Sequence, residues 1–323
     1  MKHGANIYKY KNPSKIVDFS SNINLHNPKK KFSISHKKLH RYSDTTFKKL
    51  KQTIAKNYNL KTSQIALYNG ATKAIEELIT QLPNKHIYLY APLYGEYESA
   101  VKLTNKKLHK INRFKNLYKK VKKNSIVVFV NPSTPDGRYY NLDKLLKMWK
   151  KQNATVILDE SFLEFEKLKS YRTQNYKKLY IIQSFSKFYS CAGVRVGAIF
   201  SNKKNIKNLH KTIWNLSSFD VEFLTKRLKD KKFKNKTFKK HKKAKKRLYK
   251  VLKNSKHIKK VIPSNTNFFL TKVKKPKKLF KKLLTKNILV RKCESFDFLD
   301  KNYFRFAVKS LRDVDSLCDI ISK

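Results

Sequence analysis

One stretch decides how this 323-residue chain folds: Ser184-Phe185-Ser186-Lys187-Phe188-Tyr189-Ser190-Cys191-Ala192-Gly193-Val194-Arg195-Val196-Gly197. It follows the apolar run Leu179-Tyr180-Ile181-Ile182, which is short enough to be a buried strand. Most lysines of the chain have other lysines as neighbours, whereas Lys187 lies among small, hydroxyl and aromatic residues. Such surroundings can desolvate an amine and lower its pKa, which a lysine that forms a Schiff base requires. The alternative interpretation is a strand followed by a polar turn.

The pattern Ser-x-x-Lys followed by Gly-x-Arg-x-Gly resembles the lysine region of fold-type I pyridoxal-phosphate enzymes, in the class I/II aminotransferase group. This resemblance implies that Lys187 carries pyridoxal 5'-phosphate covalently. It also implies that Ser184, Ser186 and Arg195 bind the cofactor phosphate. The implied fold is α/β, with a mostly parallel, doubly wound sheet in a large domain and a smaller α+β domain. Residues 126–200 support it, since they read as strands alternating with helices.

The composition is strongly basic, with 77 Lys and Arg against 21 Asp and Glu, and a formal net charge of +56. Such a charge raises the prospect of a nucleic-acid or membrane partner. The lysines are spread along the whole chain, however, and no nucleic-acid module signature is present. We therefore expect attraction to anionic small molecules, no specific nucleic-acid partner and no membrane partner. The basic run at 231–243 predicts a solvated helix face.

The three cysteines, Cys191, Cys293 and Cys318, form no Cys-x-x-Cys motif. An odd number without that spacing argues against a disulfide framework or a metal site, and is typical of a reducing cytosol. No apolar run approaches 18 residues, and Met1 is not followed by the apolar region of a signal peptide. We expect a cytoplasmic protein.

The segment Ile65–Ile79 reads as a strand, a glycine turn and a helix. A helix N-terminus has unpaired N–H groups and the positive end of a dipole, so it suits an anion. By resemblance, Gly70, Ala71 and Thr72 bind the cofactor phosphate here, although the motif alone is weak evidence. Further along, Tyr94 takes the position of an aromatic that lies flat on the cofactor ring. Core packing would also explain Tyr94.

Two strands end in residues that the resemblance places beside the cofactor ring. Thr134 stands where the family has an asparagine that donates to the cofactor's phenolic oxygen, and a threonine hydroxyl is shorter. Asp159 matches the aspartate that keeps the pyridine nitrogen protonated; a helix N-cap is the alternative. Phe162 follows, where phosphothreonine decarboxylases tend to carry phenylalanine and histidinol-phosphate transaminases tend to carry tyrosine. Between Asp159 and Lys187 we expect one helix and one strand.

The N-terminal residues form a polar arm with one short strand. His3-Gly4 and the segment Asp18–Asn24 resemble the arm of threonine-phosphate decarboxylases, which implies that His3 and Asn24 contact the substrate. By the same resemblance, Tyr42 reaches the cofactor phosphate of a partner subunit; a turn tyrosine packed on its own helix is the alternative. That helix is predicted at about residues 45–58, with Asp44 or Thr45 as its N-cap.

Arg291 and Arg305 occupy strand positions in apolar surroundings. A buried arginine is costly unless it pairs with an anion. Two of them favour a doubly anionic substrate, because a guanidinium binds carboxylate and phosphate well. An internal salt bridge is the alternative. By resemblance, Arg305 holds the substrate α-carboxylate and Arg291 its phosphate.

The resemblance runs from His3 to Val308. It implies a homodimer. We expect an arm (1–30) that packs with the small domain, a large cofactor-binding domain (31–213) and a small domain (214–323), with the boundary at Trp214-Asn215-Leu216-Ser217. We expect a pyridoxal-phosphate decarboxylase of a small O-phospho amino acid, L-threonine phosphate or L-serine phosphate, giving the amino-alcohol phosphate. The alternatives are an aminotransferase of the histidinol-phosphate type and a degenerate, non-catalytic binding protein. The sequence does not distinguish the phospho amino acids or name the pathway.

Overall fold

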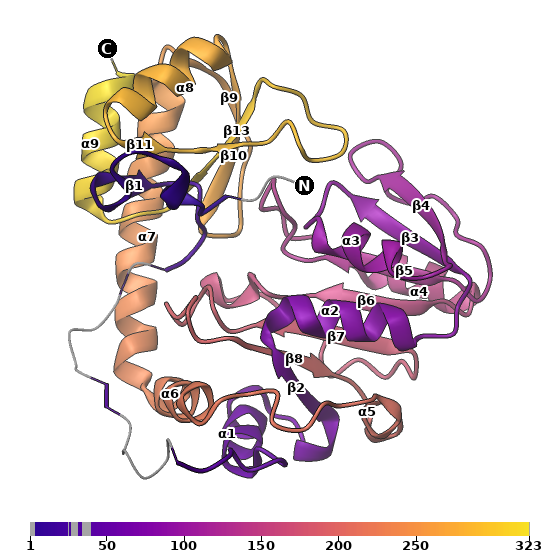
Figure 1. Cartoon of the computed structure of the whole chain (residues 1–323). Coiled ribbons are helices and arrows are strands. Elements are labelled where there is room, and N and C mark those ends of the chain that lie inside the picture. The colour runs from indigo at the N-terminus through magenta and orange to yellow at the C-terminus, as the bar shows by residue number, and fades with distance from the viewer. Residues whose placement is uncertain (1–3, 25, 27–31, 34–39, 323) are drawn as a thin grey trace.

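A large α/β sheet forms the centre of the protein in a computed structural model that describes residues 4–24, 26, 32–33 and 40–322. The sheet has seven strands in the described residues, in the order β2-β8-β7-β6-β5-β3-β4 (Figure 1). The strands β4, β3, β5, β6 and β7 run parallel to one another, and β8 runs antiparallel to its neighbours β2 and β7. The strands are β2 (Ile65–Asn69), β3 (His86–Ala91), β4 (Lys107–Asn112), β5 (Ile126–Val130), β6 (Thr155–Asp159), β7 (Leu179–Ser184) and β8 (Val196–Phe200).

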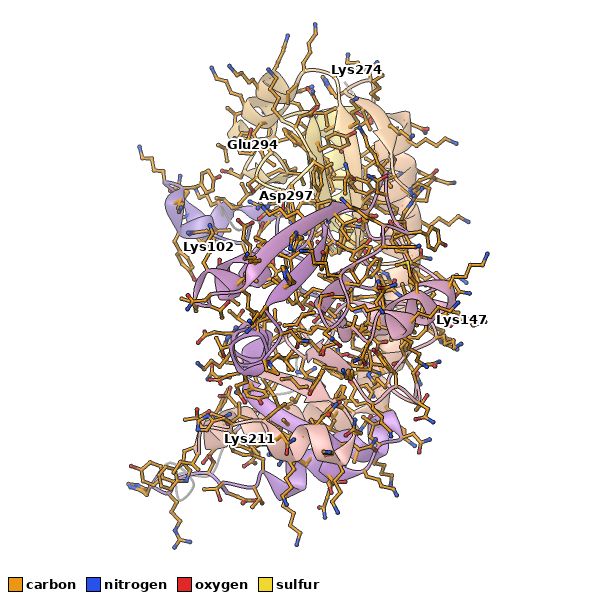
Figure 2. The ribbon with its side chains drawn as sticks, turned by 90° about the vertical axis from the view of Figure 1, so that its right-hand side faces the viewer. Lys102, Lys147, Lys211, Lys274, Glu294 and Asp297 are labelled. Atoms are coloured by element: carbon orange, nitrogen blue, oxygen red, sulfur yellow. The ribbon has the colours of Figure 1, made fainter. Side chains whose placement is uncertain are left out.

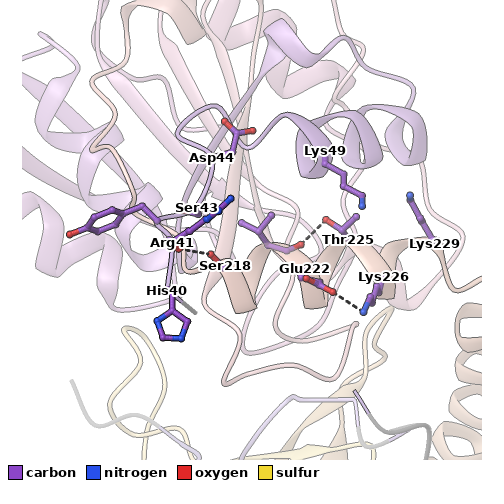
Figure 3. A pocket seen from close by; sticks show the side chains of 12 residues that line it. His40, Arg41, Ser43, Asp44, Lys49, Ser218, Glu222, Thr225, Lys226 and Lys229 are labelled. Atoms are coloured by element: carbon purple, nitrogen blue, oxygen red, sulfur yellow. Dashed lines mark hydrogen bonds and ion pairs between the residues drawn. The ribbon is translucent and has the colours of Figure 1, made fainter. Parts of the chain in front are cut away.

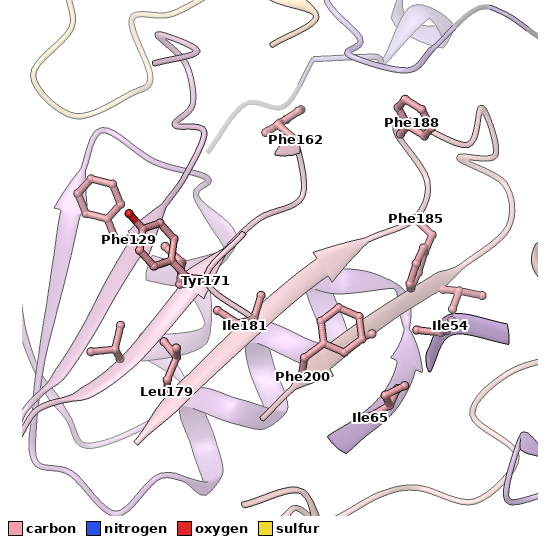
Figure 4. Close-up of a cluster of buried hydrophobic side chains, with 14 of the residues drawn as sticks. Ile54, Ile65, Phe129, Phe162, Tyr171, Leu179, Ile181, Phe185, Phe188 and Phe200 are labelled. Atoms are coloured by element: carbon pink, nitrogen blue, oxygen red, sulfur yellow. The ribbon is translucent and has the colours of Figure 1, made fainter. Parts of the chain in front are cut away.

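Helices cover both faces of this sheet because its central strands are apolar on both sides. In β5, Val128 packs with α2, α3 and α5, whereas Phe129 packs on the opposite face with α1, α4 and α6. Figure 4 shows part of this second cluster, including Ile54 of α1 and Phe200 of β8. The helices are α1 (Lys48–Tyr58), α2 (Gly70–Gln81), α3 (Glu96–Lys102), α4 (Asp143–Lys151), α5 (Lys203–Asn208) and α6 (Ser218–Lys229).

The small domain has an antiparallel sheet in the order β12-β13-β10-β9, covered by helices. The arm joins it, since β1 pairs with β11 and Phe19 is buried in its core. The elements are α7 (Lys231–Asn254), β9 (Ile258–Val261), β10 (Phe268–Val273), α8 (Pro276–Thr285), β11 (Ile288–Leu289), β12 (Arg291–Lys292), β13 (Tyr303–Ala307), α9 (Leu311–Ile321) and β1 (Val17–Asp18). Short 3-10 helices lie at Ile7–Lys9, Pro13–Lys15, Thr62–Gln64 and Leu163–Phe165.

The predicted α/β class with a mostly parallel sheet is confirmed. Two local predictions differ from the structure, and two strands were not predicted. The helix expected from residue 45 begins at Lys48, because the Asp44 carboxylate accepts the N–H groups of Thr46 and Lys48 and forms a turn before it. The helix expected between residues 159 and 187 is only the 3-10 turn at Leu163–Phe165. The strands β4 and β9 were not anticipated.

The long helix α7 spans both domains (Figure 1). α6 packs against α1, and its Leu224 and Leu228 belong to the core of the large sheet. Farther along, Ala244 and Leu248 of α7 belong to the core of the small domain. We therefore propose to keep the division into arm, large domain and small domain, but to place the seam between the last two within α7 rather than at residue 214.

Basic side chains project from many elements rather than from one face. Lys102, Lys147, Lys211 and Lys274, which lie in or next to α3, α4, α5 and β10, point outward in different directions (Figure 2). This distribution agrees with lysines that are spread along the sequence. Within the part of the chain that the structure describes, no helix combines the length and apolar character that crossing a bilayer requires.

Candidate active site

A cavity of about 240 Å³ lies where the large sheet, the arm and the small domain meet. The large sheet contributes Val130, Asp159 and the loop that carries Lys187, and the small domain contributes Arg291 and Arg305. The other lining residues are Gly4, Ala5, Ser20, Ser21, Asn22, Ile23, Tyr94, Thr134, Ser161, Phe162 and Phe296. The cavity therefore draws on all three parts of the chain.

Strand register explains why these residues converge. Asp159 at the end of β6 pairs with Val130 at the end of β5 and with Ile182 of β7. Two residues later β7 ends at Ser184, opposite Gly197 of β8. Ligands of open α/β sheets bind at the carboxyl ends of parallel strands. The loops that carry the polar residues leave the sheet at this edge.

Lys187 lies in the loop after β7, with its Nζ 5.2 Å from the centre of the Phe162 ring. Burial lowers the pKa of Lys187, and the charges of Arg195 and Arg305 lower it further, while Asp159 opposes them. The net lowering favours a neutral amine, which is the nucleophilic form. The backbone carbonyl of Lys187 accepts the N–H of Asn24 at 2.9 Å, so the arm holds the loop.

Asp159 is 5% exposed and has two hydrogen-bond donors from different elements. Its Oδ1 accepts the backbone N–H of Ser161 at 2.8 Å, and its Oδ2 accepts the hydroxyl of Tyr97 at 3.0 Å. The carboxylate lines the same cavity as Tyr94 and Lys187. Among the described residues that line it, Asp159 is the one acid.

The ends of β2, β7 and β8 form a polar cradle beside the cavity. Gly70 has a φ of +75°, and a Cβ there would lie 2.6 Å from Nη2 of Arg195, so glycine lets this guanidinium approach the start of α2. The backbone N–H of Gly70 donates to the Arg195 carbonyl at 3.0 Å. The hydroxyls of Ser184 and Ser186 are 2.8 Å apart on the neighbouring strand end.

The cradle is connected to the cavity through α2. The Oγ1 of Thr72 lies 3.5 Å from the hydroxyl of Tyr94, which lines the cavity. The helix N-terminus, two serine hydroxyls and a guanidinium are together the donors that a phosphate requires. The predicted residues Gly70, Ala71, Thr72, Ser184, Ser186 and Arg195 therefore lie in one place.

Arg291 and Arg305 are directly opposite each other on β12 and β13. Arg305 donates from Nη1 to Oγ1 of Thr134 and from Nη2 to the carbonyl of Ser20, each at 3.1 Å. Burial lowers the pKa of Arg305 to about 10. Arg291 is 7% exposed and donates to Oγ of Ser295 at 2.9 Å.

Neither arginine has a carboxylate partner among the ion pairs of the described residues. Arg291 contacts the hydroxyl of Ser295 and the ring of Phe296, whose centre is 5.3 Å from the guanidinium carbon. An internal salt bridge, the alternative to substrate binding, is therefore not seen in the described part of the chain. Two buried cations that face one cavity leave room for an anion with two acidic groups.

A family model described as aminotransferase class I and II matches residues 6–321. The chain belongs to this family. The family depends on pyridoxal phosphate, and this member is a pyridoxal-phosphate enzyme. The resemblance drawn from the sequence is thereby confirmed.

Two curated relatives and one solved structure illustrate the similarity. A protein of Caldanaerobacter subterraneus subsp. tengcongensis named "Putative threonine-phosphate decarboxylase" is 30% identical, over 98% of this chain and 91% of that protein. The adenosylcobalamin biosynthesis bifunctional protein CobDQ of Leptospira interrogans is 28% identical over 99% of this chain, which spans only 41% of that protein's length. The histidinol-phosphate aminotransferase of Clostridium acetobutylicum has a TM-score of 0.81 and 28% identity, covering 88% of this chain and 91% of that structure.

The residues of this family member fit the cofactor. Lys187 would hold it covalently, the Gly70–Thr72 turn with Ser184, Ser186 and Arg195 would hold its phosphate, and Asp159 would face its pyridine nitrogen. The fit rests on the desolvated amine of Lys187, on the donor set of the cradle and on the buried carboxylate of Asp159. No group of three or more His, Cys, Asp or Glu side chains in the described ranges is arranged to hold a metal ion.

Asn24, which was predicted to contact the substrate, does not line the cavity, whereas Tyr42 is predicted to serve the site of a partner subunit rather than this chain's own. Asn24 donates from Nδ2 to the carbonyl of Phe188 at 2.8 Å and accepts the N–H of His26, so its amide supports the loop behind Lys187. Tyr42 is 80% exposed and stacks on Trp214, with ring centres 4.5 Å apart. His3 lies outside the described residues.

Sequence reasoning missed several residues at the site. Ser20 and Asn22 of the arm and Phe296 of the small domain line the cavity, and Tyr97 holds Asp159. Ser20 and Asn22 belong to the same arm segment as Asn24. In an extended chain every second side chain points to the same side, so Asn22 was a further candidate for the substrate contact that we predicted for Asn24. Tyr97 lies three residues after Tyr94, but the neighbouring sequence gives no sign that its hydroxyl forms a hydrogen bond to a buried carboxylate.

Proposed function

We propose that this chain decarboxylates a small O-phospho amino acid, L-threonine phosphate or L-serine phosphate, and releases the amino-alcohol phosphate. The observation that carries the proposal is the pair Arg291 and Arg305. Both are buried, both line the cavity of Lys187, and neither has a carboxylate partner among the described ion pairs. A substrate with a carboxylate and a phosphate would supply both missing anions.

The roles of the residues follow from where they lie. Arg305 would bind the α-carboxylate, with its guanidinium oriented by Thr134 and Ser20, and Arg291 would bind the substrate phosphate. When bound, pyridoxal phosphate would accept the electrons of the bond that is broken at Cα. Arg305 would hold the carboxylate so that CO₂ can leave, and Nζ of Lys187, in its protonated form, would return a proton to Cα. Phe162 and the arm would shield this step from water.

Two observations favour decarboxylation over transamination. The relative named as a threonine-phosphate decarboxylase matches nearly the whole chain at 30% identity. The centre of the Phe162 ring lies 5.2 Å from Nζ of Lys187 and 5.1 Å from the centre of the Phe268 ring. Unlike a tyrosine, this side chain has no hydroxyl to present to the cavity. Phenylalanine at this position is the feature that resembles the decarboxylases. The similarity to histidinol-phosphate aminotransferase keeps transamination as the second candidate.

We also propose a homodimer. Tyr42, Ile213 and Trp214 are exposed aromatic and aliphatic side chains, between 45% and 80% accessible, and none of them lines this chain's own cavity. Beside them the segment with Arg41 and Ser43 lies against α6, around a second cavity of about 610 Å³ (Figure 3). A second copy that covers this surface would bury the exposed rings. Three free cysteines support our proposal of a cytoplasmic protein.

The proposal is tested by a product assay on purified, cofactor-loaded protein. O-phosphothreonine and O-phosphoserine are supplied separately, each with and without 2-oxoglutarate. We expect the amine phosphate and CO₂ without the keto acid, and no product from Lys187→Ala. Glutamate formed only with the keto acid would instead establish transamination. A protein that forms neither product from either substrate would overturn the assignment of a small O-phospho amino acid as the substrate.

A further inference from the structure

Tyr97 lies behind the cavity wall, in α3, and is fully buried. Its hydroxyl donates to Oδ2 of Asp159 at 3.0 Å, while Oδ1 of the same carboxylate accepts the N–H of Ser161 at 2.8 Å. The two donors come from different sides, one from a helix and one from the turn after β6. Together they determine the plane in which the carboxylate lies.

The phenol keeps its proton over the working pH range. Burial raises the pKa of Tyr97 well above its usual range, and the charge of Asp159 raises it further. A protonated phenol in this position can donate to Oδ2, and within the described part of the chain its hydroxyl has no hydrogen bond to a competing acceptor. A hydrogen bond to a charged acceptor is stronger and more directional than one between neutral groups.

We propose that Tyr97 is a positioning residue, which acts through Asp159 by holding its carboxylate in the orientation that faces the cofactor's pyridine nitrogen. The proposal rests on the cofactor site described above. Removing the hydroxyl leaves Oδ2 without a donor and lets the carboxylate rotate about its Cβ–Cγ bond. The partner of the pyridine nitrogen would then be less well placed.

A role in packing alone is the competing explanation, because Tyr97 also belongs to the apolar core between α2, α3 and the sheet. In that case phenylalanine would replace it without any effect on the cofactor. Tyr68 provides a matched control. It is 1% exposed, belongs to the same core, and its hydroxyl donates to the carbonyl of His210 at 3.5 Å, far from Asp159 in the hydrogen-bond network.

The experiment compares wild type, Tyr97→Phe, Tyr68→Phe, Asp159→Asn and the double variant Tyr97→Phe/Asp159→Asn. The readouts are the dissociation constant for pyridoxal phosphate and the pH midpoint of the absorbance change of the bound cofactor. For Tyr97→Phe we expect about tenfold weaker cofactor binding and a midpoint moved by about half a pH unit, as the loss of one bond to a charged group implies. Tyr68→Phe should match the wild type in both.

The double variant separates positioning from packing. If Tyr97 acts through Asp159, adding Tyr97→Phe to Asp159→Asn should change cofactor binding less than twofold, because interacting residues are not additive. An equal effect in both backgrounds, or Tyr97→Phe behaving as Tyr68→Phe, would overturn the proposal. A wild-type protein that shows no saturable cofactor absorbance would instead overturn the cofactor site itself, so the two failures are distinguishable.

Discussion

Replacing Arg291 tests how the site recognises its substrate. Arg291 is 7% exposed, lines the cavity and has no carboxylate partner among the described ion pairs. In Arg291→Met the substrate phosphate loses a guanidinium that can form two charge-assisted hydrogen bonds. At ~1.5 kcal/mol or more for each bond, the loss is about 3 kcal/mol, or roughly a hundredfold in kcat/KM for a phosphorylated substrate.

The selectivity of this loss is the informative part. The assay measures kcat/KM for O-phosphothreonine and for threonine, with wild type and Arg291→Met. Threonine has no phosphate, so its kcat/KM should change by less than about threefold, within the spread of indirect packing effects. Arg305→Lys is the control. It keeps the charge but loses the fork that Thr134 and Ser20 orient, and it should weaken both substrates alike.

Folding should be little affected in Arg291→Met. The side chains have similar volumes, and the exchange removes a buried charge that has no acidic partner in the described ion pairs, so we expect a change of less than ~1 kcal/mol in the free energy of unfolding. An equal loss for O-phosphothreonine and threonine in a stably folded variant would refute the assignment of Arg291 to the phosphate.

Three further predictions concern other contacts of the site and the fold. Thr134→Val removes a hydrogen-bond acceptor for Nη1 of Arg305 and should raise the substrate KM about fivefold, which corresponds to roughly 1 kcal/mol. Thr134→Ser keeps the hydroxyl, so its KM should stay near that of the wild type. Equal KM values for the two variants would contradict this prediction. Asp297→Asn breaks the 2.9 Å ion pair with Lys110, which joins the loop after β12 to β4. Because the pair is partly exposed, we expect the free energy of unfolding to fall by ~0.5 kcal/mol at low salt and to stay unchanged at high salt. A decrease that does not depend on salt would argue against this role of the ion pair. Burial lowers the pKa of His241 to about 3, so between about pH 6.5 and pH 3 the unfolded chain binds more protons than the native one, and stability falls as the pH decreases through that window. His241→Gln should reduce the fall by up to roughly 1.4 kcal/mol per pH unit in urea titrations, and parallel curves for the two proteins would refute the assignment.

The central strands could be predicted from the sequence because they are buried on both faces. Ile126–Val130 is apolar at every position, as strands of parallel sheets are. β4, with the sequence Lys-Leu-His-Lys-Ile-Asn, lies at the edge of the sheet and shows no such run. Edge strands carry charged residues that keep them from pairing with other chains, and this makes them hard to recognise.

The site was predictable where polar residues follow directly on apolar strands. Lys187 and Asp159 come after β7 and at the end of β6, and the structure brings both to one cavity. The arm could not be placed in this way, because the contact of Ser20 with Arg305 joins residues 285 positions apart. Asn24 carries the polar side chain that the motif led us to expect, but the direction of the extended arm turns it toward Phe188.

Thr134 departs from the family pattern, and the structure shows a contact of its side chain that the sequence did not predict. From the sequence it is a shorter donor at an asparagine position. In the structure its hydroxyl accepts a hydrogen bond from Arg305, so the residue orients a substrate-binding group and joins the large domain to the small one.

The identity of the lysine that binds the cofactor tests the central claim most directly. The chain has 77 Lys and Arg residues, and surface amines also react with aldehydes, so the position must be mapped rather than assumed. Cofactor-loaded protein is reduced with borohydride, digested and analysed by peptide mass spectrometry. We predict about one phosphopyridoxyl group per chain, on Lys187, and its loss in Lys187→Ala. Stoichiometric labelling of a different lysine, with Lys187 unmodified, would contradict the assignment of this cavity as the active site.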